Sequence, residues 1–245
     1  MDMRKEILKI ELMPLGEGAV LVEFGREIRP EIHQKVKAFS DYLETHSFPG
    51  FLEFVAAFSS VTVFYDPFLV NRKEERPFQS VCRILLAMMD VVQTGNEKSP
   101  DIVEIPVCYG GEFGPDLEFV AKYHGLEEEK VIELHTQGRY LVYMIGFAPG
   151  FPYLGGLSEQ IATPRRSSPR LVIPAGSVGI AGAQTGVYPI ETPGGWQLIG
   201  RTPLPLFQPK NTSLPTLLQA GNMIRFRAIS PKEYQSYQRE VSVCR

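Results

Sequence analysis

The residues best suited to chemistry lie in a glycine-, proline- and arginine-rich stretch from Tyr143 to Phe207. Its charged side chains are four arginines and two glutamates, with no lysine or aspartate. A surface meant only for solubility carries more charge of both signs. Arginine offers a planar fork of donors that suits a carboxylate or phosphate, and glycine lets backbone amides approach a ligand closely. This composition predicts an anion-binding cleft.

The candidate site residues are spread over several short segments of that stretch. For binding of the substrate or anion we expect Arg165, Arg170, Gln184, Thr185, Tyr188 and Arg201. For shaping the surrounding loops we expect Gly150, Gly176 and Gly195. The apolar walls of the cleft would come from Phe147, Phe151, Tyr153, Tyr188 and Trp196. A tight β barrel also needs glycine and proline at its corners, so a purely structural role is the alternative for each of them.

Several familiar chemistries lack their residues. Ser177 stands in Ala-Gly-Ser-Val-Gly, which is not a nucleophile elbow, and no Asp or His follows it to complete a triad. The chain has no P-loop motif for ATP and no Met-Lys-Met of a biotinyl site. Its histidines and cysteines are not at ligand spacing, so we expect no metal. His135 is expected to interact with the dipole at a helix C-terminus.

The overall composition is that of a globular protein. Hydrophobic residues make up 44% and charged residues 22%, and the net charge of −3 gives no attraction to nucleic acid or to anionic lipid. No apolar run reaches membrane-spanning length and the N-terminus is too charged for a signal peptide, which predicts a cytoplasmic protein. The three cysteines are odd in number and widely spaced, so we expect reduced thiols.

The first part of the chain predicts a small α+β layer. Alternating apolar residues indicate strands over 6–13 and 19–24, then over 51–58 and 61–65. Apolar residues at helical spacing indicate helices over 32–43 and 78–92. The order β-β-α-β-β-α fits an antiparallel sheet with both helices on one face.

A polar, breaker-rich linker over residues 94–100 separates this domain, residues 1–93, from a second one, residues 101–245. The second domain opens with a strand over 102–109 and two short helices that end near Tyr123 and His135. From Arg139 to Arg227 short β segments alternate with glycine and proline, which is typical of a barrel or sandwich.

Four long segments of the sequence resemble a known family. They are Ile-Pro-Val-Cys-Tyr-Gly-Gly-Glu-Phe-Gly-Pro-Asp-Leu at 105–117, Gly-Phe-Ala-Pro-Gly-Phe-Pro-Tyr-Leu-Gly-Gly at 146–156, Ile-Pro-Ala-Gly-Ser-Val-Gly-Ile-Ala-Gly-Ala-Gln-Thr-Gly-Val-Tyr-Pro at 173–189 and Thr-Pro-Gly-Gly-Trp-Gln-Leu-Ile-Gly-Arg-Thr-Pro at 192–203. They resemble the KipI family, which includes the B subunits of bacterial 5-oxoprolinases and is of the allophanate hydrolase subunit 1 (carboxyltransferase subunit 1) type. The resemblance implies an α+β N-terminal domain followed by a mostly-β, cyclophilin-like barrel.

The resemblance also implies a function. A chain of this kind would be the B subunit of an ATP-dependent 5-oxoprolinase, inactive alone, which hydrolyses 5-oxo-L-proline to L-glutamate together with the A and C subunits. ATP is then a cofactor of the complex, with no metal or biotin on this chain. The alternative is a KipI-type inhibitor that binds a sporulation histidine kinase through the C-terminal domain and blocks its autophosphorylation. Prolyl isomerisation would rest on fold analogy alone.

Overall fold

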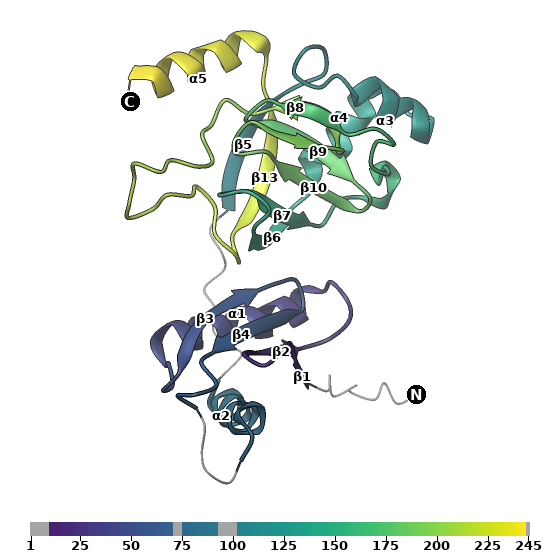
Figure 1. The fold of residues 1–245 in the computed structure, drawn as a ribbon. Coiled ribbons are helices and arrows are strands. Elements are labelled where there is room, and N and C mark those ends of the chain that lie inside the picture. The colour runs from purple at the N-terminus through teal and green to yellow at the C-terminus, as the bar shows by residue number, and fades with distance from the viewer. Residues whose placement is uncertain (1–9, 71–74, 93–101, 244–245) are drawn as a thin grey trace. The chain divides into compact units, whose positions relative to one another are not determined.

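The computed structural model describes residues 10–70, 75–92 and 102–243. The chain forms two compact units, residues 1–98 and 99–245, drawn in Figure 1. The division falls within the linker predicted over 94–100, and that linker lies outside the described residues.

Unit 1 is a four-stranded antiparallel sheet with two helices. The strand order is β1-β2-β4-β3, and the element order β-β-α-β-β-α is the one the sequence predicts. The elements are β1 (Glu11–Pro14), β2 (Ala19–Glu23), α1 (Pro30–Thr45), β3 (Phe51–Ala56), β4 (Ser60–Tyr65) and α2 (Pro77–Val91). Positions 6–9 of the first predicted strand lie outside the described residues.

The core of unit 1 lies on one face of its sheet. Alternate residues of the central strands, including Val20 and Val22 on β2 and Val61 and Val63 on β4, are fully buried. They form one cluster with the apolar stripes of both helices. These stripes consist of Ile32, Val36, Phe39 and Leu43 on α1 and of Val81 and Leu85 on α2. The apolar face of the sheet, set by the strand period of two, therefore packs against the apolar stripes of the helices, set by the helix period of about 3.6.

Unit 2 is built around a closed mixed barrel (Figure 1). Its strand order is β10-β7-β6-β13-β5-β12-β9, and β5 pairs with β13 in parallel while the other pairs are antiparallel. The barrel strands are β5 (Ile102–Tyr109), β6 (Tyr140–Ile145), β7 (Pro152–Gly155), β9 (Ser177–Ala181), β10 (Gln184–Val187), β12 (Gln197–Arg201) and β13 (Met223–Ala228). A separate two-stranded ribbon pairs β8 (Arg170–Ile173) with β11 (Thr192–Gly194). The helical elements are α3 (Leu117–His124), α4 (Glu128–Gln137), the 3-10 turn η1 (Glu159–Ile161) and α5 (Pro231–Val243).

A buried polar chain crosses the barrel interior and corrects the interpretation of His135. The ring is fully buried and stacks on Phe226. Thr185 donates to the Gly179 carbonyl at 3.0 Å, so its hydroxyl accepts from His135 Nε2–H at 3.0 Å, and His135 Nδ1 accepts from the Tyr109 hydroxyl at 2.7 Å. Burial lowers the pKa of His135 to about 3. His135 is thus a neutral core residue and not a charged partner of the helix dipole.

In residues 10–70, 75–92 and 102–243 no helix is both long enough and apolar enough to cross a bilayer. Cys82 and Cys108 carry free thiols, and burial raises the pKa of both. Cys244 lies outside the described residues.

Candidate functional site

An aromatic pocket in unit 2 is the candidate site. It encloses about 190 Å³. We call it the aromatic pocket, and its lining residues are Phe147, Phe151, Tyr153, Arg165, Tyr188, Pro193, Gly194, Gly195 and Trp196. The structure therefore brings together all five aromatic residues named from the sequence, together with Arg165 and Gly195. Apolar walls with a few polar groups are the usual make-up of a small-molecule site.

Phe151 is the centre of the aromatic cluster. Its ring makes T-shaped contacts with Phe147, Tyr153, Tyr188 and Trp196, at centroid distances of 5.4, 5.1, 5.3 and 5.5 Å respectively. Edge-to-face contacts of this kind contribute beyond the apolar area they bury. Because one buried ring touches four others, the pocket walls are fixed relative to one another.

Tyr188 supplies a protonated phenol to the pocket wall. Burial raises its pKa to about 12, although a hydrogen bond with the Trp196 backbone and the charges of Arg165 and Arg170 act in the opposite direction. The hydroxyl therefore keeps its proton at neutral pH and cannot serve as a base there.

Arg165 is the cation of this pocket. It is exposed, and within the described part of the chain it takes part in no ion pair. Its neighbours differ, because Arg166 and Arg170 both bind the carboxylate of Asp116. Arg165 is therefore free to bind an anionic group that enters the pocket.

Asp116 was missed as a site-related residue by sequence reasoning. Its side chain, only 5% exposed, accepts from Arg166 at 2.9 Å and from both terminal nitrogens of Arg170 at 2.8 Å. It also accepts from the Leu198 backbone N–H at 2.7 Å. The signal available in the sequence was its place in the 105–117 segment, one of the four segments that resemble the family.

The expectation of one cationic cleft shared by the arginines needs correction. Arg170 is held by Asp116, as described above. The Arg201 guanidinium lies 5.9 Å from the centre of the Phe113 ring, which packs against Tyr234, so it belongs to a different cluster from the aromatic pocket. Of the predicted arginines, Arg165 is the one that lines the aromatic pocket.

Gln184 and Thr185 are also outside the pocket. Gln184 begins β10 opposite Ala181 of β9, and Thr185 is fully buried with its hydroxyl engaged by His135 and Gly179. A fully buried hydroxyl that already donates one hydrogen bond and accepts another is not available to a ligand. Alternation along β10 places this side chain in the barrel interior, which the short string Gln-Thr-Gly-Val does not reveal.

The predicted loop-shaping glycines differ in what surrounds them. Gly150 and Gly176 have φ of +81° and +82°, a backbone conformation that residues with a side chain rarely adopt. A Cβ on Gly176 would also lie 2.3 Å from the Thr202 carbonyl oxygen. Gly195 could carry a Cβ without a clash, since the nearest neighbour would be Pro169 Cγ at 3.6 Å, an ordinary van der Waals contact. At Gly194 a Cβ would meet Tyr188 Oη at 2.5 Å. Close packing against Tyr188 therefore requires glycine at 194 and not at 195.

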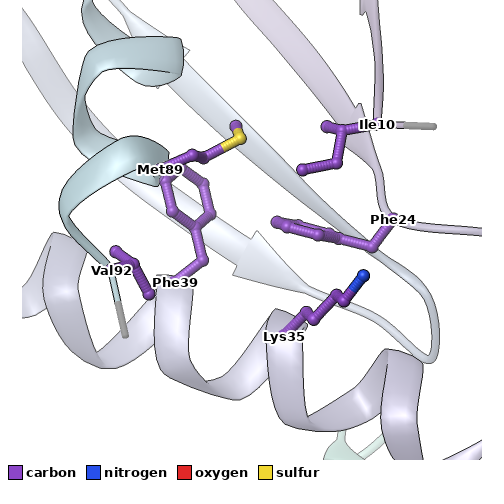
Figure 2. A pocket seen from close by; sticks show the side chains of 6 residues that line it. All are labelled: Ile10, Phe24, Lys35, Phe39, Met89 and Val92. Atoms are coloured by element: carbon purple, nitrogen blue, oxygen red, sulfur yellow. The ribbon is translucent and has the colours of Figure 1, made fainter. Parts of the chain in front are cut away.

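Unit 1 contains a second, smaller pocket of about 150 Å³, shown in Figure 2. The side chains that line it are Ile10, Phe24, Lys35, Phe39, Met89 and Val92. Figure 2 shows these mostly apolar side chains converging from both helices and from residues next to the ends of β1, β2 and α2, with Lys35 as the single charged group among them. With fewer polar groups and a smaller volume, it is a weaker candidate than the aromatic pocket. Among the residues that the structure describes, no cluster of His, Cys, Asp and Glu could hold a metal.

Comparison with known proteins defines the class of this fold. Residues 10–218 match the family described as carboxyltransferase domain, subdomain C and D. A solved structure, that of TTHA0988, superposes with a TM-score of 0.75 at 33% identity over 86% of this chain. This chain covers 40% of the TTHA0988 chain, so that protein contains further sequence beyond the shared fold.

The chain belongs to the family of 5-oxoprolinase B subunits. It is 53% identical over 237 residues to the 5-oxoprolinase B subunit of Bacillus subtilis (strain 168), and the match spans 95% of this chain and 98% of that protein. It is 43% identical to the 5-oxoprolinase B subunit of Haemophilus influenzae, over 89% of this chain and 97% of that protein. The match with both relatives takes in nearly their whole length and includes both units.

Proposed function

We propose that this chain is the B subunit of an ATP-dependent 5-oxoprolinase and is inactive without the A and C subunits. The complex would add water across the lactam C–N bond of 5-oxo-L-proline to give L-glutamate, with hydrolysis of ATP to ADP and phosphate. The names of relatives that are 43–53% identical support this role. They favour it over inhibition of a sporulation histidine kinase.

The observation that carries the proposal is Arg165 within a pocket of aromatic walls. 5-Oxoproline is a small five-membered ring with one carboxylate. Arg165 would bind the carboxylate, and the faces and edges of the surrounding rings would hold the lactam. The pocket volume of about 190 Å³ suits a compound of this size better than a nucleotide. Tyr188, which keeps its proton, would be a hydrogen-bond donor and not a base.

The rim of the pocket offers a surface for a companion protein of the complex. The β8–β11 ribbon supplies Pro193 and Gly194 to the pocket and also carries Leu171 and Val172, which are 88% and 56% exposed. Neighbouring large apolar side chains with this exposure are typical of a protein interface. We propose that the C subunit covers this ribbon, and the additional sequence of TTHA0988 supports an arrangement in which the fold works beside another domain.

ATP would bind elsewhere in the complex. The chain has no P-loop motif, and the aromatic pocket has one arginine and no lysine to hold a triphosphate. We therefore expect this chain to contribute substrate binding, in the cytoplasm where ATP is available, and another member of the complex to bind the nucleotide.

The test is reconstitution of the complex with the A and C subunits and measurement of ATP-dependent glutamate release from 5-oxoproline. Arg165→Ala should raise KM for 5-oxoproline by about 10- to 100-fold, the range expected for loss of a charge-assisted hydrogen bond. Arg165→Lys should recover part of this loss. Arg139→Ala, an exposed arginine outside the pocket, is the matched control and should leave KM unchanged.

Two outcomes contradict different parts of the proposal. If the wild-type complex releases no glutamate from 5-oxoproline, the assigned function is wrong. If it does so and Arg165→Ala has the KM of wild type, the function stands and the aromatic pocket is not the substrate site.

A further inference from the structure

Phe147, at the edge of the aromatic pocket, has an unusual backbone conformation. Its φ is +68°, and it is the one non-glycine residue with positive φ in the part of the chain that the structure describes. The Ala148 N–H donates to the Gly146 carbonyl at 2.8 Å, which closes a three-residue turn around Phe147. A positive φ at the centre of such a turn defines the classic γ-turn, which is rare and strained.

The rest of the loop keeps this turn in place. The Gly146 N–H donates to the Phe151 carbonyl at 3.1 Å, and the Phe151 N–H donates to the Ala148 carbonyl at 2.9 Å. Phe151 is itself buried at the centre of the aromatic cluster. The turn is therefore anchored to the pocket wall, and the direction of the Phe147 side chain is fixed by the backbone.

The strain at Phe147 brings no evident gain in stability. Glycine would adopt a positive φ without the steric cost of a Cβ. The Phe147 side chain is 63% exposed, so it recovers little free energy through burial, although its ring lines the pocket and meets Phe151 edge-on at 5.4 Å. A strained conformation that exposes an aromatic ring at a pocket points to a role in ligand binding.

We propose that Phe147 is a specificity-determining residue, whose fixed ring limits the size of the lactam carboxylate that the aromatic pocket accepts. This inference rests on the proposed function, because it assumes that a ring with a carboxylate is the ligand. Arg165 fixes the carboxylate end of the ligand, and Phe147 bounds the space available to the ring. A five-membered lactam is then preferred over its six-membered homologue, which needs room for one more methylene.

The test measures binding to the full chain without the other proteins of the complex. Trp196 is the single tryptophan and lines the pocket, so its fluorescence reports a bound ligand directly. The dissociation constants of 5-oxoproline and of 6-oxopipecolate, the six-membered homologue, are compared in each variant. In Phe147→Ala the dissociation constant of 6-oxopipecolate should fall relative to that of 5-oxoproline by about tenfold or more, the effect of one methylene in a shaped pocket.

Two further variants separate a role in selectivity from a role in folding. Phe147→Gly should shift the ratio in the same direction, with a thermal midpoint equal to or above that of wild type because the turn is relieved of strain. A thermal midpoint of Phe147→Gly below that of wild type would mean that the Phe147 ring stabilises the fold, and this would overturn the proposal. Phe68→Ala, which removes a phenylalanine 88% exposed on unit 1, should change neither the ratio nor the pocket fluorescence.

The outcomes also separate this inference from the proposed function. An unchanged ratio in Phe147→Ala overturns the inference, as does a wild-type chain that binds neither lactam. A shifted ratio supports it even if the reconstituted complex releases no glutamate, in which case the pocket binds lactam carboxylates and the assigned reaction is wrong.

Discussion

Arg170 and Asp116, which lie 54 positions apart in the sequence, form a two-point ion pair in unit 2. Both terminal nitrogens of the guanidinium bind the carboxylate, each at 2.8 Å. The same carboxylate accepts from Arg166 and from the Leu198 backbone, so it joins the start of α3, the arginine-rich loop and β12. The pair fixes the segment on which Arg165 stands, and its effect on the pocket is therefore indirect.

Replacing Asp116 should destabilise unit 2 without unfolding unit 1. Asp116→Ala leaves two partly buried guanidinium groups and one backbone N–H without their acceptor, at a cost of about 3 kcal/mol in the free energy of unfolding. Asp116→Asn keeps an acceptor for the Leu198 N–H and should cost less. Urea unfolding followed by the fluorescence of Trp196 measures unit 2 alone.

Glu104→Ala is the matched control for Asp116→Ala. Glu104 also binds two arginines, Arg225 and Arg227, each at 2.7 Å, but on the exposed surface of the same barrel. Solvent screens this interaction, so its loss should cost less than about 1 kcal/mol. Equal destabilisation by the two substitutions would contradict the structural role assigned to the Asp116 cluster.

Arg201→Ala should leave KM for 5-oxoproline unchanged in the reconstituted complex. The guanidinium packs over the Phe113 ring, in a cluster separate from the aromatic pocket. Its loss should lower the stability of unit 2 by about 1 kcal/mol, the scale of one cation–π contact. If Arg201→Ala raises KM as much as Arg165→Ala does, this prediction is wrong and Arg201 belongs to the substrate site.

Much of the fold follows from the sequence because its signals are local. Alternation along β2 and β4 and the helical spacing of Ile32, Val36 and Phe39 set the faces that meet in the core of unit 1. The breakers in the 94–100 segment predict a domain boundary there, and this boundary stays a prediction. The close spacing of glycine and proline after Arg139 indicated short strands, and these form a closed barrel. The cyclophilin-like description of that barrel stays a prediction.

The candidate site was only partly predictable because its electrostatics are not local. Composition alone indicated aromatic walls and an arginine, and the pocket contains both. It could not indicate that Asp116, some 50 positions upstream, neutralises Arg166 and Arg170. Nor could the sequence indicate that His135, at the end of a short amphipathic helix, points into the barrel toward Thr185. Both results depend on which strands become neighbours.

The stability of unit 2 should fall as the pH drops below about 6.5, because His135 is neutral in the fold. Its pKa is lowered by burial to about 3, so between pH 6.5 and 3 the unfolded chain binds a proton that the folded chain does not. The full stability is present above pH 6.5, and the free energy of unfolding should decrease by up to about 1.4 kcal/mol per pH unit below it. In unit 1, burial and the charge of Lys37 lower the pKa of His33 to about 4. The stability of unit 1 should therefore also fall as the pH drops below about 6.5.

The measurement is urea unfolding followed by Trp196 fluorescence at several pH values between 7 and 5, where most carboxylates stay ionised. His135→Gln should be less stable than wild type at pH 7, because the bonds to Tyr109 and Thr185 are disturbed, and should show a flatter pH dependence. The slope, and not the absolute stability, is the test. A wild-type slope that persists in His135→Gln would place the titrating group elsewhere.

Adjacent glycines in the pocket wall should differ sharply in their tolerance of alanine. A Cβ on Gly194 would lie 2.5 Å from Tyr188 Oη and 2.8 Å from Ile173 Cδ1, so Tyr188 or the β8–β11 ribbon must move. Gly194→Ala should therefore destabilise unit 2 by about 1 to 3 kcal/mol and weaken binding in the aromatic pocket. At Gly195 the nearest atom is 3.6 Å away, an ordinary contact, so Gly195→Ala should change stability and binding little. Urea unfolding and lactam binding, both followed by Trp196 fluorescence, compare the two variants directly. If Gly195→Ala proves as harmful as Gly194→Ala, flexibility of the loop and not its close packing against Tyr188 is what the pocket requires.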